Sequence, residues 1–264
     1  MPAPKALMSA VTLAGALALA GCGGGGGGGN PPNAGAEEAR KEAERLYAAL
    51  TTEGVIDHRG GPAALAEFSG ATGERDHGGI EVTGGADATY GWWVATGADG
   101  DITRVTAFYN LGGLANDDYT GALAGTGSAT YEGDATGRYA VPDGAGNFTA
   151  TAALTAGFGA APTLSGTIGN FRDADGGDLG WSVALEGTGL AYRPGEFDVR
   201  GGETVWTLGG KAGAAGGEWR ADLYGGGGNG VPTHALGTFE AGGHRGGYMV
   251  GAFGARMEPV EAAR

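Results

Sequence analysis

Cysteine is almost absent from this chain of 264 residues, which contains a single one, Cys22. A lone cysteine cannot form an internal disulfide, and an exposed free thiol is a liability in an oxidising compartment. The fold must therefore be held by packing and hydrogen bonds, and the length allows one large or two small domains with a buried core.

Basic residues are also scarce. Sixteen lysine and arginine residues stand against 30 aspartate and glutamate residues, so the net charge is −14. Because nucleic acids are bound through clustered positive charge, we expect no nucleic-acid partner. The same acidic balance repels anionic lipid headgroups.

Recognisable catalytic patterns are missing. No serine lies in a G-x-S-x-G turn, and residues 225–230 are glycine-rich but lack the lysine and hydroxyl of a phosphate loop. The four histidines do not have the spacing that places two metal ligands on one face: His58, His77, His234 and His244. We therefore predict no enzyme activity, no catalytic residue, no metal site and no cofactor.

One acidic cluster resembles part of a calcium-binding loop. Asp173, Asp175 and Asp178 alternate around two glycines, as oxygen ligands do in such loops. A complete loop needs a bidentate glutamate at a fixed distance downstream, and Glu186 is not at that distance. The cluster is therefore predicted to be a solvated acidic loop.

Long hydrophobic runs are missing as well. The uncharged stretch from Ala6 to Ala20 is too short and too rich in alanine to span a bilayer, but it has the length of a secretory signal core. It leads into Leu19-Ala20-Gly21-Cys22, which resembles the bacterial lipobox. The resemblance implies that residues 1–21 are removed and that Cys22 carries a diacylglyceryl group. The alternative is a signal peptide that merely ends near a cysteine.

Glycine is abundant instead, at 60 residues. The run that follows Cys22 and the Asn- and Pro-containing segment after it predict a flexible tether over 22–35. Residues 36–50 have apolar positions at helical spacing, which predicts a helix, and residues 63–68 predict a second, short one. Trp92–Val94 and Ile102–Tyr109 flank an Asp-Gly turn and predict a hairpin.

From residue 126 to residue 256, apolar and polar residues alternate. The clearest run is Phe148–Phe158, in which Thr149, Thr151 and Thr155 separate apolar positions. Many short strands without intervening helices predict a sandwich or a barrel, and small inward side chains favour a narrow, filled barrel. A barrel that spans the outer membrane is disfavoured, because the apolar positions are often alanine or glycine and a second aromatic girdle is missing.

Several phrases of this region resemble the β-barrel domain of the transferrin-binding protein B family. The resemblance covers residues 90–256 and implies an all-β fold with a minor N-terminal helical segment. In detail, it implies an eight-stranded antiparallel soluble barrel over 126–256, a small handle-like region over 36–125 and a tail over 257–264. Family receptors carry two such lobes and one fits here, so a single-lobe surface lipoprotein is expected. The phrases are Tyr90–Tyr109, an opening hairpin of Gly125–Gly133 with Gly137-Arg138-Tyr139, Leu164–Phe171, and a closing hairpin of Leu236–Ala241 with Val250–Arg256.

The predicted function is that of a binding module. We expect an outer-membrane lipoprotein, anchored through Cys22, whose barrel loops bind an external protein or small molecule. The long connections predicted to carry recognition are Arg172–Gly180, Gly187–Gly202 and Gly225–Thr233. Tyr192 and Arg193 are residue types that interfaces favour, although they could equally pack their loop onto the barrel. The alternative function is a structural envelope lipoprotein with no soluble ligand.

The closing strand, Gly246–Ala255, makes a sharper prediction. Tyr248 and Phe253 are an odd number of residues apart, so they must lie on opposite faces. We expect Phe253 to point into the barrel.

Overall fold

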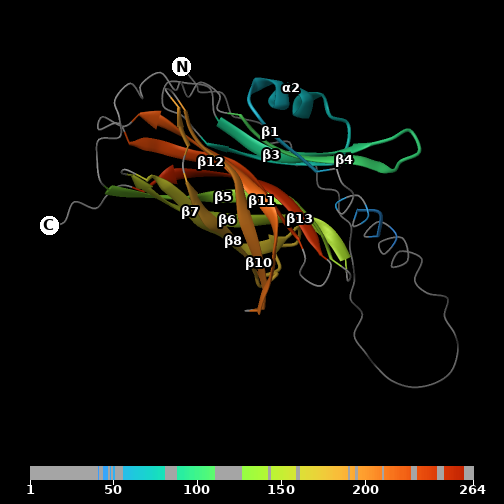
Figure 1. The fold of residues 1–264 in the computed structure, drawn as a ribbon. Helices are drawn as coiled ribbons and strands as arrows, with labels where there is room; N and C mark the ends of the chain where they lie inside the picture. The colour runs from blue at the N-terminus through green and yellow to red at the C-terminus, as the bar shows by residue number, and fades with distance from the viewer. Residues whose placement is uncertain are drawn as a thin grey trace, which may run out of the picture.

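The structure is a computed structural model that describes most of the chain after residue 55. The described residues form a barrel with a smaller layer of sheet and helix packed on one side of its wall (Figure 1). Residues 1–40, which include the predicted signal peptide, the tether and Cys22, lie outside them. The described residues are 41, 44–46, 48, 50, 56–80, 88–110, 127–141, 144–158, 161–189, 191–193, 196–209, 211–226, 231–242 and 247–258.

The smaller layer, residues 56–110, is called the handle here. Its four strands have the order β1-β4-β3-β2, and β1 is parallel to β4 while the other neighbours are antiparallel. Helix α2 covers one face of this sheet (Figure 1). The elements are β1 (Ile56–Gly60), α2 (Pro62–Gly70), β2 (Arg75–Ile80), β3 (Ala88–Thr96) and β4 (Ile102–Asn110).

The short helix and the β3–β4 hairpin confirm two predictions. The helix predicted over 36–50 is confirmed where the structure describes it, since residues 41, 44–46, 48 and 50 are helical and Leu46 and Leu50 are buried. Among the helices in the described part of the chain, none has the length and apolarity needed to cross a bilayer.

The larger sheet closes into a barrel of eight antiparallel strands, which confirms the predicted fold class. The last strand pairs with both of its neighbours, β12 and β5, and thereby closes the ring. A short extra strand, β9 (Ala191–Arg193), pairs with the start of β10. In order around the barrel the strands are β5 (Gly127–Val141), β6 (Gly144–Phe158), β7 (Thr163–Asp173), β8 (Trp181–Gly189), β10 (Glu196–Leu208), β11 (Lys211–Gly226), β12 (Pro232–Gly242) and β13 (Tyr248–Met257).

Two local predictions are wrong. Residues 127–141 form one continuous strand and no hairpin, with an unbroken ladder to β6. The predicted connection Gly187–Gly202 is mostly strand, because β8 continues to Gly189 and β10 already begins at Glu196. In both segments glycine removes a side chain but leaves the backbone donor and acceptor in place, so the ladder continues through it.

The barrel interior is filled with side chains. Alternate residues of β6 from Phe148 to Phe158 are buried, as their pattern predicts. The ring of Phe171 packs between those of Phe148 and Trp181, with centroid distances of 4.9 Å and 6.1 Å. The ring centroids of Trp181 and Trp206 are 5.1 Å apart. The interior is therefore a packed core.

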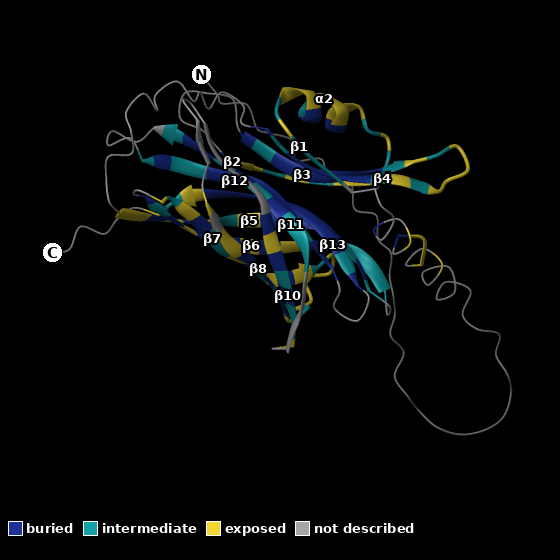
Figure 2. Cartoon of the chain, in the orientation of Figure 1, coloured by how far each residue is buried: buried dark blue, intermediate teal, exposed yellow. Residues whose placement is uncertain are grey.

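A second core lies between the barrel and the handle. Tyr90, Trp92 and Val105 of the handle pack on Val250 and Ala252, which face outward from β13. On the opposite face of the handle, α2 covers the sheet through a third apolar cluster: Ala64, Phe68, Trp93 and Phe108. Helix, handle sheet and barrel wall thus form successive layers with buried apolar side chains between them, while the outer side of α2 is exposed (Figure 2).

Glycine allows close approach in the wall beneath the handle. A Cβ atom at Gly237 would overlap the backbone oxygen of Arg220 and lie 2.5 Å from the Phe253 ring. We expect Gly237→Ala to lower the free energy of unfolding by about 1–3 kcal/mol, as overpacking does. Chemical denaturation measures this loss. The control is Gly169→Ala in β7, where the added Cβ would meet no atom within 4 Å; equal losses at both positions would contradict the explanation.

Candidate functional site

The predicted ligand-binding residues Tyr192 and Arg193 lie in β9, in a strand and not in an open loop. Their backbone pairs with Phe197 and Glu196 at the start of β10. These two residues are also neighbours in the sequence. Cys22 is outside the described residues.

In the acidic cluster at the end of β7, two of the carboxylates accept hydrogen bonds from backbone N–H groups of the turn itself. Asp173 Oδ1 accepts hydrogen bonds from the backbone N–H groups of Asp175 and Gly177, at 3.0 Å and 2.7 Å. Asp178 Oδ1 accepts one from Gly180 at 2.8 Å. Within the part of the chain that the structure describes, no three His, Cys, Asp or Glu side chains are grouped to hold a metal ion.

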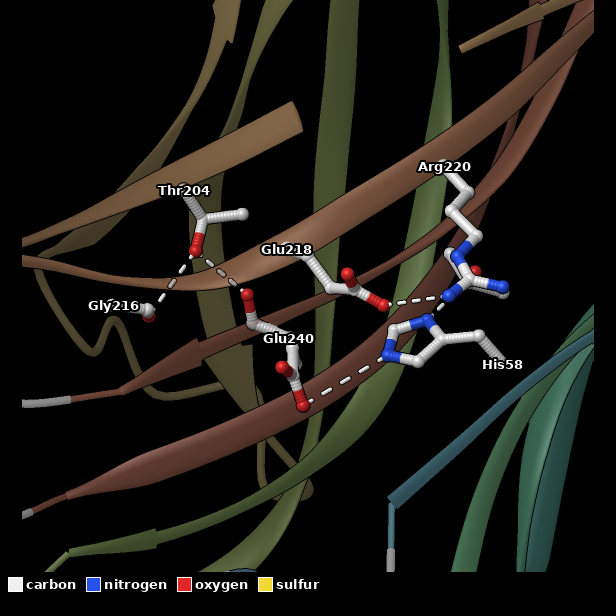
Figure 3. Close-up of polar contacts among 7 residues, drawn as sticks. His58, Thr204, Gly216, Glu218, Arg220 and Glu240 are labelled. Atoms are coloured by element: carbon white, nitrogen blue, oxygen red, sulfur yellow. Dashed lines mark hydrogen bonds and ion pairs between the residues drawn. The ribbon is translucent and has the colours of Figure 1, made fainter. Parts of the chain in front are cut away.

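At one edge of the handle, a buried histidine contacts the barrel wall (Figure 3). His58 of β1 lies 2.9 Å through Nδ1 from Thr238 Oγ1, and its Nε2 is 3.9 Å from the carboxylate of Glu240. Tyr109 of β4 donates a hydrogen bond to Asp222 on the neighbouring strand β11. The His58 side chain is only 6% exposed, so these contacts attach the handle and offer no access to a substrate.

At the other edge, an arginine from the barrel reaches under the handle. Arg138 of β5 donates to Asn147 Oδ1 at 2.6 Å, pairs with Glu74 and lies 5.8 Å from the ring centre of Trp92. Asp76 of β2 accepts a hydrogen bond from the Thr136 hydroxyl at 2.8 Å. These contacts hold β2 against β5 and fix one wall of the groove beside it.

This groove, called the handle–barrel groove here, runs between β2 and the barrel strands β5, β6 and β7. It is open to solvent and has a volume of about 450 Å³. Its polar lining comes from the handle and from three barrel strands: Asp76, His77, Tyr90, Asp134, Thr136, Thr149, Thr151, Asn170 and Arg172.

Tyr90 and Asp134 distinguish this groove. The Tyr90 side chain is buried, with the residue 3% exposed, yet its side chain lines the groove and no described residue hydrogen-bonds to its hydroxyl. Burial raises the pKa of Tyr90, and the charges of Asp134 and Asp76 raise it further, so the hydroxyl stays protonated and can donate. Asp134 is exposed and has no ionic or hydrogen-bond partner among the described residues.

A wider groove of about 600 Å³ crosses the outer wall of β5, β6, β7 and β8. Ala153 and Ala184 line it together with Glu132 and Glu186. Its lining also includes four residues with aliphatic hydroxyl groups: Thr130, Thr155, Ser165 and Thr167.

The sequence predicts neither groove. The lining of the handle–barrel groove combines handle residues with barrel residues that are far away in the sequence. No local sequence pattern predicts that they lie side by side. Arg172 begins one of the connections predicted to carry recognition, and Thr151 and Tyr90 lie in segments predicted to be strands, but none of these signals predicts that the three residues share a groove.

Comparisons with known proteins find similar structures. No family model matches the sequence, and no curated protein matches it. The chain is similar to a mutant of transferrin-binding protein B from Haemophilus parasuis, with 14% identity, a TM-score of 0.40, and 72% of this chain and 38% of that chain covered. It is also similar to isotype 1 transferrin-binding protein B from serogroup B Neisseria meningitidis, with 15% identity, a TM-score of 0.34, and 69% and 36% covered. The match thus spans well under half the length of these two proteins, which carry the name of the family that the sequence phrases resemble.

Proposed function

We propose that this protein is a lipid-anchored binding module of the outer membrane. Cys22 carries the lipid, residues 23–35 act as the tether, and the barrel with its handle presents the binding surface. The resemblance of Leu19–Cys22 to a lipobox supports the anchor, and several acyl chains make such an anchor stable where one chain would not.

The observation that carries the binding role is that the barrel interior is filled while its outside is grooved. Among the described residues, Tyr131, Phe148, Trp206 and Trp219 are buried in the interior and belong to its packed core. The grooves on the outside are open, and polar and apolar groups line them about equally, whereas small-molecule sites are mostly enclosed and apolar. A protein partner therefore fits these surfaces better than a small molecule.

We further propose that Tyr192 and Arg193 contact this partner from the β9–β10 hairpin. The test offers the full chain, purified in detergent, to proteins of the same cell envelope and of its surroundings, and measures saturable binding. A double substitution, Tyr192→Ala with Arg193→Ala, is expected to weaken binding about thirtyfold, the size of an interface hot spot. Deletion of 187–202 is unsuitable, because it would remove parts of β8 and β10 and open the barrel.

The matched control is Ser128→Ala, an exposed substitution in β5 that should leave affinity unchanged. A saturable partner that the double variant binds normally would rule out the hairpin as the contact. Absence of any saturable partner would favour the structural envelope role.

A further inference from the structure

The handle–barrel groove contains two polar groups that the fold itself does not use. These are the Tyr90 hydroxyl and the Asp134 carboxylate, neither of which has a hydrogen-bond partner among the described residues. Buried tyrosines normally place their hydroxyl on a partner, because an unsatisfied donor in a buried position is costly. A hydroxyl left open to a groove is therefore a reason to ask what binds there.

The position of Tyr90 is fixed by its surroundings. Its ring lies against Gly254 of β13, where an added Cβ would come within 2.6 Å of the ring, and its hydroxyl lies beside Gly78 of β2. Two glycines thus provide the slot that the ring fills. The hydroxyl is held at the groove by packing, and a ligand would meet it without having to order it first.

The charge around Tyr90 is negative. Asp134 is exposed on β5, and Asp76 offers a carboxylate whose oxygens already accept from Thr136 and from the His77 N–H, each at 2.8 Å. The positive group of the groove, Arg172, donates to the carbonyl of Gly176 in its own turn at 3.0 Å. A cation at the Tyr90 end would therefore meet two carboxylates and a fixed hydroxyl oxygen.

On the side away from β3, the backbone of β2 has N–H and C=O groups that do not pair with another described strand. Val94 donates to the Glu74 carbonyl at 2.8 Å, so in this antiparallel ladder Glu74, Asp76 and Gly78 bond toward β3. Arg75 and Gly79 then direct their backbone groups to the other side. Among the described strands β2 has no neighbour besides β3, so this edge can accept an extended chain.

We propose that the handle–barrel groove binds an extended basic segment of a protein partner, with a lysine or arginine cation placed between Asp134, Asp76 and the Tyr90 hydroxyl. The inference rests on the proposed binding function and specifies the chemistry of one contact. The net charge of −14 favours approach of such a segment at long range.

The test measures binding of a pentapeptide with blocked ends, Thr-Val-Lys-Val-Thr, to the full chain in detergent. Titration calorimetry at low salt gives the affinity. Asp134→Asn and Tyr90→Phe are each expected to weaken binding of this peptide about tenfold, since the first removes the negative charge that pairs with the lysine and the second removes a hydrogen bond to a charged group. The same peptide with acetyl-lysine should bind at least tenfold more weakly than the lysine form. Tyr90→Phe keeps the ring in its slot, so its thermal unfolding should match that of the unchanged protein.

The matched control is Glu132→Gln, which removes one negative charge from an exposed site two residues away on the same face of β5. It should leave the affinity within about twofold, because an exposed charge that does not touch the ligand adds little. An equal loss for Glu132→Gln and Asp134→Asn, or equal binding of the acetyl-lysine peptide, would mean that only overall charge attracts the peptide and would overturn the proposal.

A free polyamine could supply the same kind of group, a protonated amine, in place of a lysine side chain. If spermidine binds through Asp134 and Tyr90 while the pentapeptide does not, the occupant is a small amine and the proposed segment is wrong. If neither binds, the cation site is wrong. That result leaves binding at the β9–β10 hairpin intact, so it is distinct from failure of the proposed function.

Discussion

Replacing Cys22 by serine is expected to abolish metabolic labelling of this protein with palmitate and to leave an unprocessed precursor. The lipid is attached through the thiol, and the resemblance to a lipobox implies that cleavage before this residue follows the attachment. Because Cys22 is the only cysteine, the chain offers no second thiol to replace it. The precursor would retain residues 1–21 and so be separable from the mature protein by size.

The control is the Ser9→Ala variant. Ser9 lies within the apolar signal core, and its replacement by alanine should leave labelling normal. Both variants would be followed by labelling and by membrane fractionation. If Cys22→Ser still carries label and sediments with the outer membrane, the lipobox interpretation is wrong and the anchor must be sought elsewhere.

Alternation makes the barrel strands predictable, because it is a local property. In β6 every second residue is apolar, and the alternating burial of Phe148–Phe158 follows directly. The same rule places Tyr248 and Phe253 on opposite faces of β13 from their spacing alone. By contrast, β1 has the sequence Ile-Asp-His-Arg-Gly, in which no apolar alternation exists, and its pairing with β4 depends on tertiary contact.

The polar contacts between handle and barrel could not be predicted for a related reason. His58 and Thr238 are 180 positions apart, and neither lies in a pattern that marks the other as its partner. The slot around Tyr90 depends on Gly78 and Gly254, which in the sequence are two glycines among 60. A sequence shows where side chains are missing, but only the fold shows which ring fills the space.

The closing strand gives the prediction with the largest expected effect on stability. Phe253 is fully buried in the barrel interior, as its position in the alternation predicts, and β13 pairs with β12 on one side and β5 on the other. Phe253→Ala should lower the free energy of unfolding by about 3–5 kcal/mol, because it leaves a cavity that neighbouring strands cannot close. That is a large share of the stability of a typical domain.

Tyr248, on the opposite face, should matter less. Its side chain is half-buried and packs at the margin of the core between handle and barrel. Tyr248→Ala is therefore expected to cost about 1–2 kcal/mol, part of the value for a fully buried side chain. Burial raises the pKa of Tyr248, and the charge of Glu240 raises it further.

Chemical denaturation of the two variants beside the unchanged protein measures both losses. The difference between them is the decisive quantity, because both substitutions remove an aromatic ring from the same strand. Equal and small losses would mean that neither face of β13 is packed as the barrel requires, and closure through this strand would then be wrong. A loss at Tyr248 as large as that at Phe253 would instead show that the handle contributes as much to the stability of β13 as the barrel interior does.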